Sequence, residues 1–594
     1  MKQLPLPITR QKLTVIAVSA LLTACSLNTE QELASKEQER LKKQNTPTLS
    51  VPLPAQPAPV TLAEEDAVTE AEAVYEAYVA QSAAVRQEKA KLFASPAVGD
   101  MSIGIQPPTV ERENYAHFDD NPLKLVIESP VSTFSIDVDT GSYANVRRFL
   151  NQGQMPRADA VRAEELINYF SYEYAKAENR VRPFSLNTEL AVTPWNPNTH
   201  LLHIGIRGFE QQHAQLPPSN LVFLVDVSGS MNSPDKIGLL KSALKMLTRQ
   251  MTAQDRIAIA VYAGAAGTVL EPTAGNNRAA IESALDRLAA GGSTNGAAGI
   301  RLAYQLAEKS FVEGGVNRVL IATDGDFNVG TTNFEALKEL IERKRESGIA
   351  LTTLGFGTGN YNDHLMEQLA DVGNGNYAYI DTLKEAQKVL VDERAATLMT
   401  IAKDVKIQIE FNPAEVSDYR LIGYENRVLA REDFNNDKVD AGDIGAGHTI
   451  TALYEITLTD SAKKHIDPLR YGDRQSSESR NDELAFLRLR YKQPEASDSR
   501  LIEQVISKAS INPQWRSTSE NFRFAASVAA FAQTLRGGKY LNDFDYSDIR
   551  QLASNARGAD RFGYRGEFLQ LLGLAESLDA RVDAAQNDAI DNAG

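Results

Sequence analysis

The sequence predicts a doubly wound α/β domain with a mostly parallel sheet between residues 218 and 398. Residues 221–225 (LVFLV) form a continuous apolar run, which is typical of a strand buried on both faces of a parallel sheet. Further strands are expected at 256–262, 318–322 and 350–355, and they alternate with expected helices near 236–251, 279–288, 297–309, 334–347 and 363–369. This alternation favours helices on both faces of the sheet.

The segments on either side of this domain have other patterns. Residues 123–217 predict a small α+β domain, with a strand at 133–138, helices ending at Leu150 and covering 158–170, and strands at 184–192 and 200–207. We expect Asp139 or Thr140 to cap the first of these helices. Residues 399–580 predict a β domain followed by helices at 521–535, 547–555 and 566–578, and the polar residues 581–594 are expected to fray.

The N-terminus has the features of a lipoprotein signal peptide, residues 1–24. Three cationic residues precede an apolar run of about a dozen residues, whereas a membrane-spanning helix needs roughly 20. The run ends in Leu22-Thr23-Ala24-Cys25, which resembles the bacterial lipobox, and this resemblance implies cleavage before Cys25 and acylation of its sulfur. Cys25 is the single cysteine of the chain, so a disulfide framework and multi-thiolate zinc sites are excluded.

Two segments separate Cys25 from the first compact region. Residues 25–61 are polar and then rich in proline, a composition that favours an extended tether. Residues 62–122 begin with an Ala- and Glu-rich stretch that predicts a helix to about residue 93, followed by a linker.

Composition excludes several classes of protein. Of 594 residues, 43% are hydrophobic and 24% charged, which excludes a polytopic membrane protein and a fully disordered chain. The net charge is −16, and removal of residues 1–24 with their three cations would make it −19. Such an acidic chain argues against nucleic acid as a partner.

Oxygen-bearing side chains come from three separate segments of the predicted sheet. Asp226, Ser228 and Ser230 follow the apolar run at alternate positions, Thr294 lies in the Gly-rich segment 291–295, and Asp324 follows the strand at 318–322. Because the carboxyl ends of parallel strands meet at one edge, where ligands bind, we expect these residues to converge there. The simpler interpretation is that Asp226 and the serines only cap the following helix.

This pattern resembles the metal-ion-dependent adhesion site of von Willebrand factor type A (VWA) domains, which have a Rossmann-like fold. Asp-x-Ser-x-Ser, a Thr in a Gly-rich loop and Thr-Asp-Gly after a strand are all present, in that order. The resemblance implies a Mg²⁺ ion, or Mn²⁺ or Ca²⁺, held by Asp226, Ser228, Ser230, Thr294 and Asp324. The lipobox, residues 132–150, residues 432–456 and the helical end extend the resemblance to YfbK-type bacterial lipoproteins.

The residue chemistry agrees with such a site. Mg²⁺ takes oxygen ligands, is commonly held by one or two carboxylates and keeps some positions for water or another ligand. Asp226 and Asp324 would supply the charge and the hydroxyls neutral oxygens, leaving a position for an Asp or Glu of a partner protein.

The expected function is therefore protein binding and not catalysis. We expect an envelope lipoprotein, anchored through Cys25 and presenting the VWA domain to an unidentified protein; Ser26 after the cysteine resembles the sorting pattern for the Gram-negative outer membrane. Two alternatives stay open. One is a metal-assisted hydrolase or phosphatase that uses Asp137 or the Asp226 site, although no His or Glu lies within a few residues of Asp226, Thr294 or Asp324. The other is a scaffold whose metal only stabilises the fold.

Overall fold

The computed structural model describes residues 113–210, 216–292, 296–325, 331–359, 361–466 and 482–591, with side chains described except at 331–333 and 582–591. Cys25, the tether, the expected helix at 62–93 and Thr294 lie outside these residues. Among the helices in the described ranges, none combines the length and the apolar character that a membrane crossing requires.

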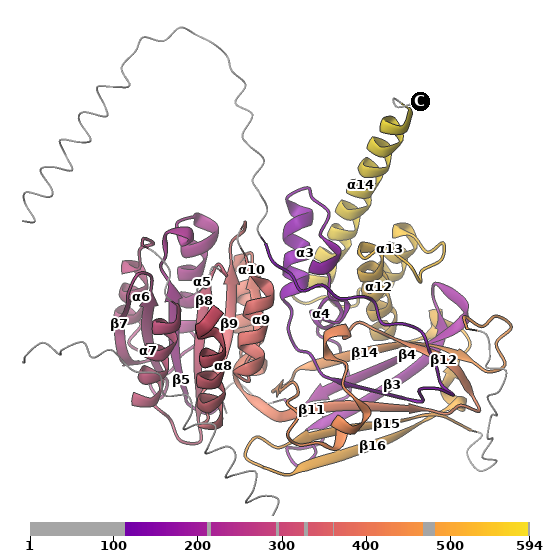
Figure 1. The fold of residues 1–594 in the computed structure, drawn as a ribbon, viewed down its shortest axis with the longest axis horizontal. Helices are drawn as coiled ribbons and strands as arrows, with labels where there is room; N and C mark the ends of the chain where they lie inside the picture. The colour runs from indigo at the N-terminus through magenta and orange to yellow at the C-terminus, as the bar shows by residue number, and fades with distance from the viewer. Residues whose placement is uncertain are drawn as a thin grey trace, which may run out of the picture. The chain divides into compact units, whose positions relative to one another are not determined.

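A mostly parallel sheet lies at the centre of the α/β domain (residues 219–398), as the sequence predicts (Figure 1). Its order is β10-β9-β8-β5-β6-β7, and every neighbouring pair is parallel except β6 and β7. The first strand of the domain, β5, lies between β6 and β8, so the strand order reverses there. The strands are β5 (Ser219–Asp226), β6 (Arg256–Tyr262), β7 (Ala266–Ala274), β8 (Val316–Thr323), β9 (Ala350–Phe356) and β10 (Tyr377–Ile380).

Helices cover both faces of this sheet because alternate residues of β5 point to opposite sides. Leu221 and Phe223 share a core with α5, α6 and α10, whereas Val222 and Leu224 share a core with α7, α8 and α9. The helices are α5 (Leu239–Thr248), α6 (Arg278–Arg287), α7 (Gly296–Lys309), α8 (Thr331–Glu346), α9 (Asp363–Val372), α10 (Leu383–Gln387) and α11 (Arg394–Leu398).

Two strands of the domain were not predicted. β7 has no fully buried residue and contains Pro272, so it lacks the apolar pattern of an internal strand. β10 is only four residues long. The helix expected at 236–251 begins at Leu239, after a π-helical turn at Pro234–Gly238.

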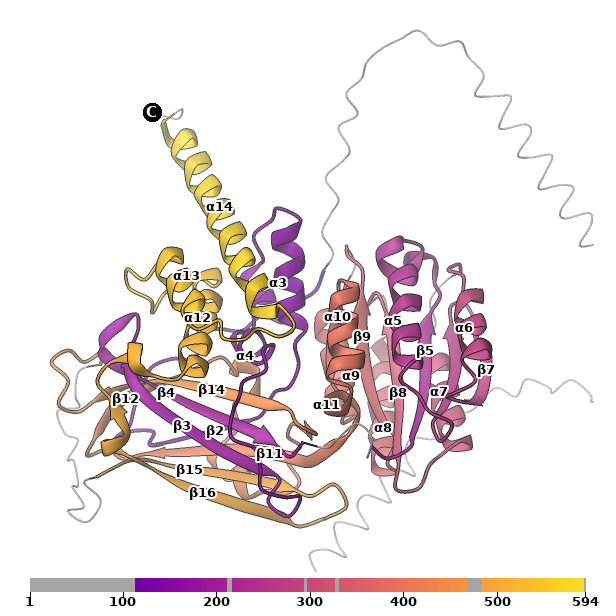
Figure 2. The same cartoon turned by 180° about the vertical axis from the view of Figure 1, so that it is seen from behind.

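The segments before and after the α/β domain form one body, which we call the frame (residues 113–208 and 400–591), and not the two domains that the sequence suggested (Figures 1 and 2). One sheet has the order β1-β12-β14-β4-β3-β17; in the other, β13-β11-β15-β16, β11 also pairs with β2. Both sheets thus mix strands from the two segments. The strands are β1 (Lys124–Leu125), β2 (Val131–Ser135), β3 (Phe184–Thr193), β4 (Asn196–Gly208), β11 (Thr400–Phe411), β12 (Val416–Ile422), β13 (Ile444–Gly445), β14 (Thr449–Leu458), β15 (Glu483–Lys492), β16 (Ser499–Ser507) and β17 (Ile511–Asn512).

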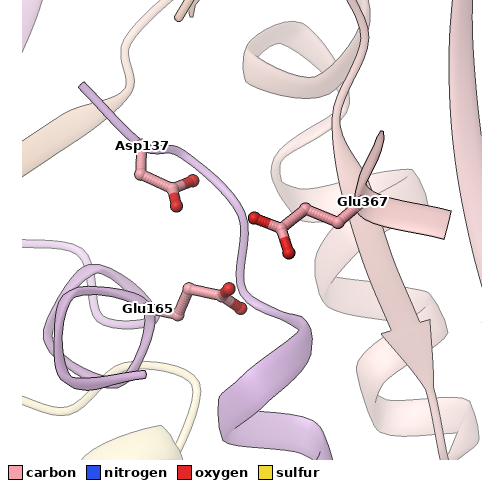
Figure 3. A group of neighbouring side chains, drawn as sticks. All are labelled: Asp137, Glu165 and Glu367. Carbon is pink, nitrogen blue, oxygen red and sulfur yellow. The ribbon is translucent and has the colours of Figure 1, made fainter. Parts of the chain in front are cut away.

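Buried ion pairs join the α/β domain to the frame. Arg162 of the frame binds Asp363 of α9 at 2.7 Å, and Arg427 binds Glu367 of the same helix at 2.9 Å. Figure 3 shows three buried carboxylates that point toward one another in this contact, from the segment after β2, from α4 and from α9: Asp137, Glu165 and Glu367.

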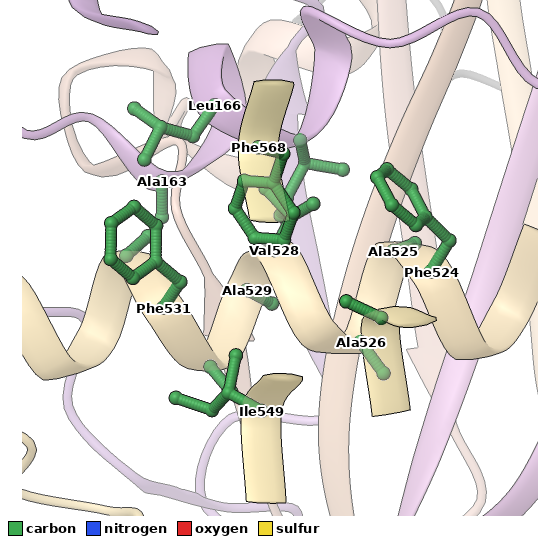
Figure 4. Close-up of a cluster of buried hydrophobic side chains, with 14 of the residues drawn as sticks. Ala163, Leu166, Phe524, Ala525, Ala526, Val528, Ala529, Phe531, Ile549 and Phe568 are labelled. Atoms are coloured by element: carbon green, nitrogen blue, oxygen red, sulfur yellow. The ribbon is translucent and has the colours of Figure 1, made fainter. Parts of the chain in front are cut away.

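A helical core covers the second face of the β14–β4 sheet. Its centre is α12, whose small residues Ala525, Ala526 and Ala529 let neighbouring helices approach closely, while Phe524 and Phe531 contact Phe568 of α14 (Figure 4). α14 continues through Asp591, beyond the helix end and into the tail that the sequence predicted to fray. The helices are α3 (Gly141–Asn151), α4 (Ala163–Asn168), α12 (Glu520–Leu535), α13 (Tyr546–Ser554) and α14 (Tyr564–Asp591).

Candidate metal centre

Asp226 and Asp324 lie at the same edge of the sheet because β5 and β8 are parallel neighbours. The register pairs Val225 with Ala322, so Asp226, the last residue of β5, lies beside Thr323. The Thr323 hydroxyl donates to Asp226 Oδ2 at 2.8 Å, and Asp324 follows directly. This edge is where the strand order reverses, the usual ligand-binding position in open α/β sheets.

The loop after β5 folds back on Asp226 and brings the two serines together. The Ser228 N–H donates to Asp226 Oδ1 at 2.8 Å, and the Oγ atoms of Ser228 and Ser230 lie 3.0 Å apart. Ser228 precedes the short 3₁₀ turn Gly229–Met231, yet its side chain makes no capping hydrogen bond. Helix capping therefore does not account for these hydroxyls.

The Gly-rich segment before Thr294 packs against the same loop. Gly229 N–H donates to the Gly292 carbonyl at 3.0 Å, and Gly291 N–H donates to the Val227 carbonyl at 2.7 Å. Gly292 has a φ of +94°, a conformation that favours glycine. The described backbone next to Thr294 thus lies beside Asp226, Ser228 and Ser230.

Asp226 is held in place by hydrogen bonds to both of its carboxylate oxygens. Besides Ser228 and Thr323, the Tyr262 hydroxyl donates to Oδ2 at 3.1 Å. Burial raises the pKa of Asp226 above its ordinary value, the hydrogen bonds from Ser228 and Thr323 oppose this rise, and the charge of Asp324 adds to it. The two carboxylates therefore interact electrostatically, as a shared cation site requires.

Lys236 also belongs to this edge and was not predicted from the sequence. Its ammonium lies 2.9 Å from Asp324 Oδ2, with the lysine side chain 9% exposed and the aspartate side chain fully buried. A signal was present, because Lys236 lies four residues before Leu240, at a helix position that continues the buried stripe of α5.

The described donors fit a hard divalent cation. They are two carboxylates and two hydroxyls, all oxygen, at an edge where two acidic side chains repel each other unless a positive charge compensates. Lys236 supplies one such charge to Asp324.

The carboxylates of Asp137, Glu165 and Glu367 form a second acidic group, in which one oxygen from each lies within 4.8 Å of the others (Figure 3). Arg427 binds Asp137 and Glu367, and Arg162 binds Glu165. Burial raises the pKa of Glu165 to about 8, against the opposing charge of Arg162. The ion pairs identify this group as part of the contact between the α/β domain and the frame.

Asp137 and its neighbours have structural partners. Asp137 is 4% exposed; its Oδ1 accepts from Asp139 N–H at 2.9 Å and its Oδ2 from Arg427 at 3.1 Å. The expected helix caps were wrong: Thr140 precedes α3 without a capping bond, and Asp139 accepts from Tyr377 N–H of β10 at 2.7 Å. Asp139 therefore connects the frame to the α/β domain, and Asp137 is held by partners within the frame.

Three families match the chain in succession. Residues 109–203 match the family described as "von Willebrand factor", residues 220–393 match "von Willebrand factor type A domain", and residues 396–578 match "Uncharacterized protein YfbK, C-terminal". The chain thus contains a VWA domain, which coincides with the α/β domain described above.

Similar proteins match different shares of the chain. The protein YfbK of Escherichia coli strain K12 is 48% identical over 501 residues, which are 83% of this chain and 86% of YfbK. The Synechocystis protein sll0103 is 31% identical over 31% of this chain and 43% of its own length. A solved structure of a von Willebrand factor type A protein from Catenulispora acidiphila is 14% identical, covers 66% of this chain and 91% of its own, and has a TM-score of 0.38. The identity and coverage with YfbK show that this chain belongs to the family of YfbK-type proteins with a VWA domain.

Proposed function

We propose that this protein is an envelope lipoprotein whose VWA domain binds another protein through a divalent metal ion. The observation that carries the proposal is the grouping of Asp226, Ser228, Ser230 and Asp324 at the edge where β5 and β8 end. Oxygen donors at a strand-order reversal are suited to a cation and to a ligand approaching from outside the sheet.

The proposed roles rest on the contacts of the described residues and, for Thr294, on its place in the motif. Asp226, Ser228, Ser230, Thr294 and Asp324 would hold Mg²⁺, Mn²⁺ or Ca²⁺. The ion would supply an electrophilic position that an Asp or Glu side chain of the partner completes. Tyr262 and Thr323 fix the Asp226 carboxylate by donating to Oδ2, so they orient it without being ligands.

Calorimetric titration of Mn²⁺ into the full chain tests the metal site. We expect one binding event that is lost or weakened at least tenfold in Asp226→Asn and Asp324→Asn. Asp286→Asn is the matched control, because Asp286 is an exposed aspartate of the same domain whose carboxylate pairs with Lys245. Equal Mn²⁺ affinity in all variants would contradict the site.

Affinity capture from envelope extracts tests the protein partner. We expect a protein that is retained by the wild-type chain with Mg²⁺ and released by EDTA, and that the Asp324→Asn variant does not retain. A partner retained equally by wild type and variant in EDTA would show that recognition takes place on another surface.

The proposed anchor is the acylated Cys25, and the proposed location is the outer membrane. Several acyl chains would hold the protein more firmly than a single chain does. Cys25→Ala should leave the precursor unprocessed or release the protein from membranes. If the variant still fractionates with the outer membrane as a band of mature size, the anchor lies elsewhere.

We propose binding in preference to the two alternatives, a hydrolase and a scaffold. The enclosure of Asp137 by Arg427 and Asp139 disfavours it as a nucleophile. The effect of EDTA on stability tests the scaffold alternative. A cation at about 100 times its dissociation constant adds about 2.7 kcal/mol of stability, which is a shift and not a requirement for folding. We therefore expect EDTA to lower the thermal midpoint and leave the domain folded. An unfolded circular dichroism spectrum in EDTA would favour the scaffold.

A further inference from the structure

Lys236 places a positive charge at the edge where the proposed cation binds. Its Nζ lies 2.9 Å from Asp324 Oδ2, and both side chains are buried. Burying a lysine ammonium costs free energy unless a charged partner compensates it. The pair is therefore part of the buried structure of the edge and not a surface contact.

The neighbouring backbone makes room for the lysine. Gly357, directly after β9, has a φ of +76°, and a Cβ at this position would overlap the side-chain methylenes of Lys236. The aliphatic stem therefore crosses the Gly357 backbone on its way to Asp324. The π-helical turn at Pro234–Gly238 contains Lys236, and such irregular turns are frequent at functional sites.

The lysine changes the charge balance of the edge. Asp226 and Asp324 alone would neutralise a divalent cation. With the Lys236 ammonium included, the three described side chains and a divalent cation have a combined formal charge of plus one. The ammonium therefore opposes the entering cation, and the loaded edge attracts an anion.

We propose that Lys236 is a specificity-determining residue of this edge, which weakens divalent-cation binding and selects a carboxylate as the group that completes the loaded site. The proposal deepens the proposed function and rests on it.

Calorimetric titration of Mn²⁺ into the full chain tests the first part. We expect the neutral variants Lys236→Gln and Lys236→Met to bind Mn²⁺ at least tenfold more tightly than wild type. Lys236→Arg, which keeps the charge, should stay within about threefold. The matched control is Lys309→Gln. Lys309 is 64% exposed, pairs with Glu271, and is the last residue of α7, whose first residue lies close in sequence to the Gly-rich segment of the metal edge.

Acetate is the probe for the second part. Paramagnetic relaxation of ¹³C-acetate by the bound Mn²⁺ reports how often a carboxylate reaches the ion. At saturating Mn²⁺, acetate affinity should fall at least threefold in Lys236→Gln and stay unchanged in Lys309→Gln. Equal acetate affinity in wild type and Lys236→Gln would overturn the selective role.

The outcomes separate this proposal from the one on which it rests. Absence of Mn²⁺ binding in wild type and in every Lys236 variant would contradict the metal site itself. Binding of equal affinity in wild type and in both neutral variants would leave the metal site standing and overturn the role of Lys236. If far-UV circular dichroism shows that both neutral variants fail to fold, the lysine serves folding, which also contradicts the proposal.

Discussion

His203 of β4 is a buried histidine at the junction between a frame sheet and its helices. Its Nε2 lies 2.9 Å from the Tyr174 hydroxyl, and its ring packs against Phe522 of α12. Burial lowers the pKa of His203 from 6.5 to about 4. The folded frame therefore holds this ring neutral at pH values where the unfolded chain protonates it.

This shift predicts a pH dependence of stability. Because the folded pKa is lower than the unfolded one, the contribution of His203 is present above pH 6.5 and is lost as the pH falls toward 4. We expect the difference in free energy of unfolding between wild type and His203→Gln to shrink by about 3 kcal/mol over that range. Urea unfolding at several pH values measures it. Parallel pH profiles for the two proteins would contradict the burial of a neutral ring.

At the metal edge, the residues that belong to a sequence motif could be predicted. Lys236, which reaches the edge only through a tertiary contact, could not. Asp226 ends β5, Ser228 and Ser230 follow it at alternate positions, and Asp324 directly follows β8, so their position at the edge could be predicted. Lys236 reaches Asp324 from a helix turn 88 residues away in sequence, and no spacing rule connects the two.

At the scale of elements, the contact between α4 and α9 depends on charge. Arg162, the residue directly before α4, is almost fully buried and binds Glu165 of α4 and Asp363 of α9. Burial raises the pKa of Glu165, and the positive charge of Arg162 opposes this rise. The arginine therefore compensates the negative charge of the carboxylates that are buried in this contact.

Removal of this arginine should be costly. Arg162→Met leaves Glu165 and Asp363 buried without their cation, and we expect a loss of about 3–5 kcal/mol in the free energy of unfolding. Arg343→Met is the control; its pair with Glu339 is exposed and should contribute about 1 kcal/mol or less. Chemical denaturation measures both. Equal small losses would mean that the contact does not depend on this ion pair.

Elements with a strong apolar period could be predicted, and those formed mainly through tertiary contact could not. The strand at 256–262 was predicted at the observed bounds. The helix expected at 158–170 is interrupted: residues 158–160 form a 3₁₀ turn, and α4 covers only Ala163–Asn168. There the Ser142 side chain binds the Ala160 carbonyl and the Arg162 N–H, which replaces the hydrogen bonds of a continuous helix.

At the scale of the whole molecule, the VWA domain is an insertion within the frame. The chain leaves the frame at Phe209 and returns at Met399, and both residues bind one turn: Gly447 N–H donates to the Phe209 carbonyl, and Ala446 N–H donates to the Met399 carbonyl, each at 2.9 Å. The sequence suggested separate flanking domains because local patterns do not reveal that β2 pairs with β11.

This arrangement predicts that the frame folds without its insertion. Replacing residues 211–397 by a short Gly-Ser linker should give a frame with native near-UV circular dichroism and one cooperative unfolding transition, because the exit and entry points are adjacent. Arg162 and Arg427 would lose their partners on α9 but would then be exposed to water, so no unpaired charge would stay buried. A product without fixed aromatic signals would show that the VWA domain is required to complete the frame.

The pairing of β2 with β11 also fixes the order in which the parts of the chain can fold. Thr133 and Gln408 bind each other across 275 residues, whereas all strands of the VWA domain come from one continuous stretch. During synthesis from the N-terminus, the VWA domain can therefore close its core while β2, β3 and β4 still expose open sheet edges. Such edges are sites of aggregation, and pairings of this range form slowly. The nascent chain thus has to be protected at its earliest strands until its last third has been made.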